Sequence, residues 1–166
     1  MKRTYSILTV ATLLFIAAGC LNAGSQAATA SKTVTVQAAQ PKDEPRVISF
    51  SDLVPTNTPE AIPVLQKLVS TGNVIVDFYA LWCQPSKYMS PIIDALAQKY
   101  PSITFVKVDI DAYDAISEAF ELGGERVVVK SVPTFYFLKN GVLMDKISGG
   151  MPKGAFEKRL ANTFSL

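Results

Sequence analysis

Cys83 is the residue of this chain best placed to do chemistry. It stands in the stretch WCQPSK (residues 82–87), between an apolar run and a segment with helical spacing. The free N–H groups at the N-terminus of such a helix favour the thiolate form of a nearby cysteine. Lys87 adds a positive charge nearby, and Pro85 suits a first helical turn, where no N–H group is needed. The pattern therefore predicts a nucleophilic thiolate.

The composition excludes most of the partners that such a thiol can have. The 166 residues contain two cysteines, Cys20 and Cys83, and no histidine. The chain therefore has no Cys–His pair, no imidazole base and no histidine-ligated metal. Two cysteines are also too few for a thiolate zinc site or a disulfide scaffold. A net charge of +2 is too small to indicate a nucleic-acid surface, so we expect no metal, no cofactor and no nucleic-acid partner.

The apolar positions from residue 46 onward alternate between strand and helix spacing. Strands are expected at residues 47–50, 74–79, 103–109, 134–138 and 143–148. Helices are expected from residues 58–60 (or from Pro63) to Val69, and at 86–99, 112–122 and 153–164, with Asp111 as the N-cap of the third. The strand at 74–79 would be buried on both faces and leads to Cys83. This order predicts an α/β fold with a mixed sheet, in which parallel crossovers precede an antiparallel hairpin at 139–141.

The stretch VDFYALWCQPSK (residues 76–87) resembles the active site of the thioredoxin family, whose usual form is VDFWAxWCGPCK. The likeness extends over residues 46–166 and includes Pro91, FVKVDID (105–111), SVPT (131–134), FLKNG (137–141) and Gly149-Gly150. It implies a thioredoxin fold, with a mixed central sheet flanked by helices.

The resemblance also implies roles for individual residues. Cys83 matches the attacking thiol, and Asp77 matches the buried aspartate behind the site, which would relay protons. Lys107 matches the lysine near that aspartate. From the residues alone, Asp77 could instead be a satisfied polar residue of a strand, and Lys107 a solvated strand lysine.

The same comparison implies a surface for client proteins. Trp82 matches the tryptophan that shields the thiol, and Gln84 and Pro85 follow the thiol on the same surface. Pro133 matches the proline whose preceding peptide bond is cis. That bond would present the backbone of Val132 to an extended substrate.

The chain departs from the family pattern at three places. Ser86 occupies the position of the second cysteine, Gln84 replaces a glycine, and Gly123–Lys130 is longer than the usual loop before the cis proline. Ser86 can donate a hydrogen bond to the Cys83 thiolate, but a serine hydroxyl cannot release a mixed disulfide. Release then requires an external thiol, a substrate thiol or a partner reductase.

Two classes of function fit these residues. The first is an enzyme of protein-disulfide oxidoreductase or isomerase type, in which Cys83 forms mixed disulfides with protein clients that carry disulfides or thiols. The second is a redox-inactive or covalently retaining chaperone that uses the same fold and groove. Iron–sulfur binding, as in monothiol glutaredoxins, and peroxide reduction with an outside resolving partner are further alternatives.

The N-terminus predicts export. Lys2 and Arg3 precede an apolar run at residues 7–18, which is too short for an ordinary membrane span. The run ends in AAGC (residues 17–20), which resembles a bacterial lipobox and implies a signal peptide at 1–19 and lipidation of Cys20. Ordinary cleavage after Ala30 is the alternative. Residues 20–45 are expected to form a flexible tether to a domain at 46–166. The lipid on Cys20 would hold the protein at a membrane, with the domain facing the periplasm.

Overall fold

The computed structural model describes residues 46–166, except Asn57 and Ala119. The expected signal peptide, tether and lipidated Cys20 lie outside the described residues. The described elements, in chain order, are β1 (Arg46–Ser49), the 3-10 helix η1 (Phe50–Asp52), α1 (Ala61–Val69), β2 (Asn73–Tyr79), α2 (Gln84–Lys99), β3 (Ile103–Asp109), α3 (Asp114–Glu118), β4 (Phe120–Leu122), β5 (Glu125–Val127), β6 (Thr134–Lys139), β7 (Val142–Ser148) and α4 (Lys153–Phe164).

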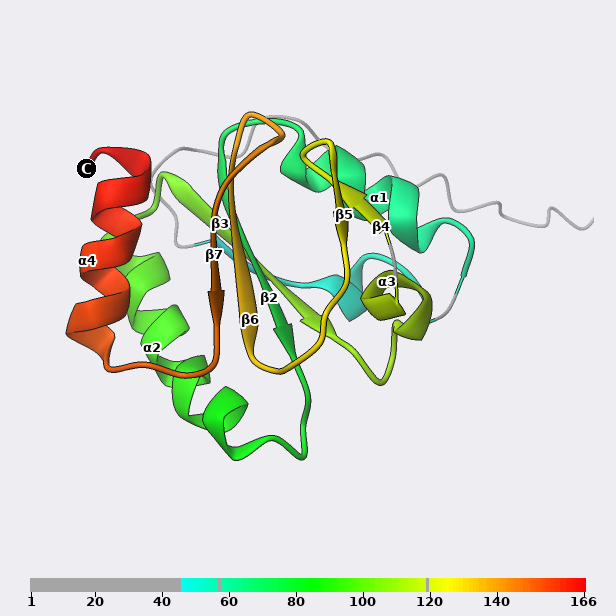
Figure 1. The fold of residues 1–166 in the computed structure, drawn as a ribbon, viewed down its shortest axis with the longest axis horizontal. Coiled ribbons are helices and arrows are strands. Elements are labelled where there is room, and N and C mark those ends of the chain that lie inside the picture. Colours follow the sequence, from blue (N-terminus) through cyan, green and yellow to red (C-terminus); the bar gives the residue numbers. More distant parts are fainter. Residues whose placement is uncertain (1–45, 57, 119) are drawn as a thin grey trace, which may run out of the picture. The chain divides into compact units, whose positions relative to one another are not determined.

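Five of the strands form one mixed sheet in the order β1-β3-β2-β6-β7 (Figure 1). β1, β3 and β2 run parallel, whereas β6 is antiparallel to both β2 and β7. The mixed sheet that the sequence predicts is therefore confirmed. Because β2 and β3 are parallel, their carboxyl ends meet at one edge of the sheet, and the chain leaves β2 there toward Cys83.

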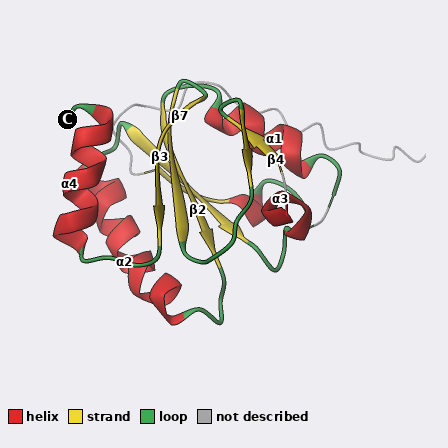
Figure 2. Cartoon of the chain, viewed as in Figure 1, coloured by secondary structure: helices red, strands yellow, loops and turns green. Residues whose placement is uncertain are grey.

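Helices cover both faces of this sheet (Figure 2). Side chains of β2 alternate between the two faces, so Val74, Val76 and Phe78 join a core with α1, α3 and the β4–β5 hairpin. Ile75 joins the second core, which α2 and α4 complete. Residues 74–78 are buried, which confirms that β2 is a central strand covered on both sides.

Several predicted elements agree closely with the structure. β3 and α4 have the predicted bounds, and β6 and β7 meet at a turn in which Asn140 and Gly141 have φ of 51° and 79°. The first helix begins at Ala61 rather than at 58–60, with Pro63 in its first turn, where a missing N–H group costs no hydrogen bond. No helix within residues 46–166 is long and apolar enough to cross a bilayer.

The helix predicted at 112–122 is wrong over its second half. α3 covers only Asp114–Glu118, and β4 then pairs antiparallel with β5. Gly123 and Gly124 have φ of 61° and 81°, a left-handed conformation that forms the turn between these strands and is incompatible with a continuing helix. The N-cap assigned to Asp111 is also wrong, because α3 starts three residues later and the Asp111 carboxylate accepts a hydrogen bond from Trp82.

Candidate functional site

Cys83 lies at the junction between β2 and α2. Its N–H group donates to the carbonyl of Ala80 (3.1 Å), which closes the turn that follows β2. Cys83 is the N-cap of α2, with an extended backbone (φ −83°, ψ 115°), and its carbonyl accepts from the N–H group of Lys87 at 3.1 Å. The side chain is only 8% exposed. The predicted position at a helix N-terminus is therefore what the structure shows.

The loop before β6 approaches the thiol. Sγ of Cys83 donates to the carbonyl of Val132 at 3.4 Å, and the bond between Val132 and Pro133 is cis, as the resemblance implies. Thr134 Oγ1 donates to the carbonyl of Ser131 (2.6 Å), and Gly149 N–H donates to that of Pro133 (2.7 Å). These bonds fix the downstream end of the loop beside Cys83.

Ser86 lies one turn along α2 from Cys83 and is 5% exposed. Its Oγ has no hydrogen-bond partner among the described residues. The expected hydrogen bond from Ser86 to Cys83 is not made between these two described residues, and Sγ of Cys83 donates to the carbonyl of Val132 instead. A buried, unpartnered hydroxyl therefore occupies the position of the family's second thiol.

Asp77 is a buried carboxyl group on β2. It is 2% exposed, and its Oδ1 has no partner within the described part of the chain. Burial raises the pKa of Asp77 to about 7, against the opposing effect of the positive charge of Lys107. A carboxyl group with this pKa can accept or donate a proton near neutral pH.

Lys107 is directly opposite Asp77 on β3. Its Nζ donates to Ser90 Oγ of α2 at 2.7 Å and lies 5.3 Å from the centre of the Tyr79 ring. Lys107 is half-buried and held by these contacts, so it is not a freely solvated strand lysine. It acts on Asp77 through its charge, and no ion pair joins these two described residues.

The outer side of the site exposes apolar groups. Trp82 is 65% exposed, and its Nε1 donates to Asp111 Oδ2 at 2.8 Å, which ties the indole to the segment after β3. Gln84 and Pro85 are also exposed. The sequence did not indicate the bond to Asp111, because only the fold brings the ends of β2 and β3 together.

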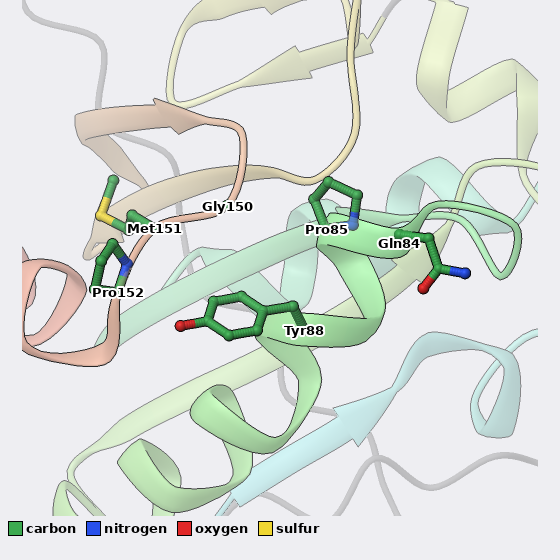
Figure 3. A pocket seen from close by; sticks show the side chains of 6 residues that line it. All are labelled: Gln84, Pro85, Tyr88, Gly150, Met151 and Pro152. Carbon is green, nitrogen blue, oxygen red and sulfur yellow. The ribbon is translucent and has the colours of Figure 1, made fainter.

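An open hollow of about 610 Å³ adjoins the start of α2. Gln84, Pro85, Tyr88, Gly150, Met151 and Pro152 line it. Figure 3 shows the ring of Tyr88 extending toward Met151 and Pro152, whereas Gln84 points away. Tyr88, Met151 and Pro152 were not predicted from the sequence as residues of the site. The Gly149-Gly150 pair is the sequence signal for this hollow, because a Cβ at Gly150 would lie 3.4 Å from Pro85 Cβ.

The described residues contain no group of three or more acidic, histidine or cysteine side chains that could hold a metal. What they do provide is a thiol, a carboxyl group that titrates near neutrality and a neighbouring backbone carbonyl. A sequence model of the family described as Thioredoxin matches residues 63–162.

The chain belongs to the thioredoxin family.

Two relatives illustrate this membership. The thioredoxin of Mycoplasmoides gallisepticum is 40% identical over 97 residues, which cover 58% of this chain and 90% of that protein. A thioredoxin H-type of Ricinus communis is 41% identical over 78 residues, covering 47% of this chain and 60% of that protein.

Solved thioredoxin structures are also similar. Thioredoxin NaTrxh from Nicotiana alata has a TM-score of 0.57 and 28% identity, over 75% of this chain and 98% of that one. Mitochondrial thioredoxin 3 from Saccharomyces cerevisiae has a TM-score of 0.51 and 34% identity, over 60% of this chain and 88% of that one. The mixed α/β thioredoxin fold and membership in this family of thiol-disulfide oxidoreductases are thereby confirmed.

Proposed function

We propose that this member of the thioredoxin family exchanges thiols and disulfides through Cys83 alone. The observation that carries the proposal is Ser86, a buried serine one turn from Cys83 where the family's usual motif has its second cysteine. Cys83 is the free cysteine of the described residues. Cys20 would be acylated or removed with the signal peptide under either cleavage model, so it would not serve as a partner.

The proposed reaction has two exchange steps. The Cys83 thiolate attacks one sulfur of a client disulfide, a new S–S bond forms, and the other client sulfur leaves as a thiolate that then takes a proton. An external thiolate then attacks the client sulfur of the mixed disulfide and regenerates Cys83. Alternatively, the freed client thiolate attacks a second disulfide of the client, and the thiolate released from that bond attacks the client sulfur of the mixed disulfide. Cys83 is then expelled as a thiolate, and the client's disulfides have been isomerised. Ser86 does neither, because its alkoxide is negligible at neutral pH.

Asp77 and Lys107 are the proposed proton-handling groups. With a pKa of about 7, the carboxyl group of Asp77 is present in both protonation states at neutral pH. It lies on β2, the strand that leads to Cys83, and we assign it the relay of protons to and from the reacting thiols. Lys107 limits the rise of that pKa through its positive charge and is therefore a positioning and tuning residue.

Client polypeptides are proposed to bind along the surface around Cys83. Val132 presents its carbonyl next to the thiol, and the exposed residues Trp82, Gln84 and Pro85 flank Cys83 in the sequence. An extended client segment would pair with the backbone of Val132 and place its disulfide on Sγ.

A client-holding function is the second candidate, and exposed apolar side chains favour it. Leu81, Trp82 and Tyr88 are 67%, 65% and 56% exposed around a thiol that is itself nearly buried. Such a surface suits unfolded segments. In a Cys83→Ser background, retention of an unfolded client that falls with Tyr88→Ala and persists with Tyr88→Phe would support non-covalent holding.

We further propose that the protein works in the cell envelope of a bacterium, anchored by lipid on Cys20. The support is the basic and apolar N-terminal sequence that ends at AAGC. An envelope location would give Cys83 access to secreted clients that carry disulfides. Its partners there would be those clients, an external thiol or reductase, and the membrane.

Trapping of mixed disulfides in the producing cell tests the proposed function. Cells are quenched with acid and alkylated, and the protein is isolated without reductant. We expect client proteins or small thiols disulfide-linked to Cys83, and their loss in Cys83→Ser. Recovery of Cys83 only as the free thiol would overturn thiol exchange and favour the holding function.

A further inference from the structure

The β4–β5 hairpin (Phe120–Val127) lies directly upstream of the loop that contacts Cys83. It forms a two-stranded sheet of its own, separate from the main sheet. In Figure 1 the chain continues from β5 into the loop that turns into β6. The hairpin is therefore placed to control how the chain enters that loop.

The hairpin is anchored in the core. Phe120, Leu122 and Val127 are 4%, 1% and 3% exposed and belong to the core that includes α1. The ring of Phe120 lies 5.9 Å from that of Phe78 of β2. Gln66 Nε2 of α1 donates to a hairpin carbonyl, that of Glu121, at 3.3 Å. The hairpin is thus fixed against both the sheet and α1.

The turn of the hairpin packs tightly on the β6–β7 hairpin. A Cβ at Gly123 would lie 2.5 Å from the backbone nitrogen of Leu143 and 3.0 Å from the carbonyl oxygen of Gly141. A Cβ at Gly124 would meet nothing within 4 Å. The two turn glycines therefore differ in packing, although both have positive φ.

The anchored region continues to within two residues of the site. Val128 is 37% exposed, whereas Val129 packs against the same core as the hairpin. Only Lys130 and Ser131, both exposed, separate Val129 from Val132, whose carbonyl accepts the hydrogen bond from Cys83.

We propose that the hairpin is a positioning element for the thiol site, and that Val129 transmits its anchorage to the carbonyl of Val132. Thr134 and Gly149 fix the loop from its downstream side, and Val129 fixes it from upstream. The inference rests on the proposed function, because a well-placed Val132 matters only if a client must align there with Cys83. Val129 is not a catalytic residue, since it acts only through Val132.

The test compares two disulfides that share one leaving group. One is an extended peptide whose cysteine is linked to thionitrobenzoate, and the other is the small symmetric disulfide of thionitrobenzoate. Attack by Cys83 releases the coloured thiolate from both. Only the peptide must align with Val132, so the ratio of the two rate constants reports positioning.

Val129→Ala is expected to lower the peptide-to-small ratio by about fivefold or more, because small misplacements at a reacting centre are costly. Val129→Ile keeps the packing and is expected to keep the ratio. Val128→Ala truncates the exposed neighbour, and Val69→Ala truncates a valine of the same core on α1. Both controls should leave the ratio unchanged. An equal fall of the ratio in Val69→Ala would overturn the proposal, because it would show that any loss of packing in this core has the same effect.

The turn glycines provide a second matched pair. Gly123→Ala should lower the same ratio and Gly124→Ala should not, since only the first collides with the β6–β7 hairpin.

A measurement that needs no reaction of Cys83 separates this inference from the proposed function. The methyl order parameters of Val132 should fall in Val129→Ala but not in Val69→Ala. If the order parameters do not fall in Val129→Ala, the positioning role is overturned. If they do fall but Cys83 reacts with neither disulfide, only the proposed function is refuted.

Discussion

The thiol of Cys83 donates a hydrogen bond to the backbone carbonyl of Val132, 3.4 Å away and 49 positions later in the chain. The contact joins the start of α2 to the loop before β6, and it places a main-chain acceptor beside the reactive sulfur. A thiolate cannot donate, so the bond is lost when Cys83 ionises or forms a disulfide. Under the proposed function, the carbonyl of Val132 would then accept an N–H group of a client.

Ser86→Cys is expected to create a resolving thiol. The new sulfur would lie one turn from Cys83, where its high effective concentration favours release of mixed disulfides. Reduction of insulin in the presence of dithiothreitol should rise by about tenfold or more. Ser102→Cys, at an exposed position between α2 and β3, adds a thiol elsewhere and should give no rise. Equal rates in both variants would contradict the assignment of Ser86.

Asp77→Asn is expected to stabilise the protein above neutral pH. Burial raises the pKa of Asp77 from 3.8 to about 7, so the folded state binds a proton that the unfolded chain has released between these values. Stability therefore falls as the pH rises from about 4 to about 7, and this loss is absent in the asparagine variant. Urea unfolding at about pH 8 should show a gain of about 2–4 kcal/mol in Asp77→Asn.

Asp145 supplies a control of opposite sign. Its hydrogen bonds with the Arg159 guanidinium lower the pKa of that carboxyl group. Stability from this pair is present above the ordinary pKa of aspartate and is lost as the pH falls. Asp145→Asn should therefore destabilise the protein at neutral pH. A gain in both variants at about pH 8 would contradict the burial argument for Asp77.

Asp111→Ala is expected to release the indole of Trp82. Trp82 is the one tryptophan of the sequence, so intrinsic tryptophan fluorescence reports on the site alone. Loss of the 2.8 Å bond should raise acrylamide quenching by about twofold and change the free energy of unfolding by less than about 1 kcal/mol, because the bond is exposed. Glu125→Ala, at an exposed position of β5, should leave quenching unchanged. Unchanged quenching in Asp111→Ala would show that the indole is held by other contacts.

Cys20→Ser is expected to abolish acylation and release the protein from membranes. Metabolic labelling with a fatty acid and membrane fractionation measure both effects. Membrane retention without acylation would contradict the lipobox interpretation. The Cys83→Ser variant should remain acylated and membrane-bound, which separates the anchor from the thiol chemistry.

Periodicity was sufficient for the elements that hold the site. The apolar run at β2 and the helical spacing of α2 identified the junction at Cys83. The loop that meets it was identified by the resemblance of SVPT (131–134) to the thioredoxin family. Signals of the first kind are local, because the spacing of apolar residues within one strand or helix predicts that element. The predicted α/β order and mixed sheet follow from them.

The β4–β5 hairpin was mispredicted because its signals conflict. Residues 114–118 do form a helix, and Phe120, four positions after Ile116, fits its continuation, whereas Phe120 and Leu122, two positions apart, fit a short strand. The deciding feature is the left-handed turn at Gly123 and Gly124, together with pairing of Phe120 with Val127. This local pairing depends on the turn and cannot be deduced from helical spacing alone.

The side-chain contacts of the site were likewise beyond sequence reasoning. Lys107 reaches Ser90 on α2, and Trp82 reaches Asp111 after β3. Each contact joins two elements whose relative positions only the folded sheet determines. The residues could be named from the sequence, but their partners could not.

The close fit of Gly123 against Leu143 has a consequence for how this chain can change over evolutionary time. A side chain at position 123 would collide with the β6–β7 hairpin, so it requires a compensating shift near Gly141 and Leu143. The two turns are therefore expected to covary in descendants that keep the hairpin. Lineages that delete the hairpin would free positions 141–143 to diversify.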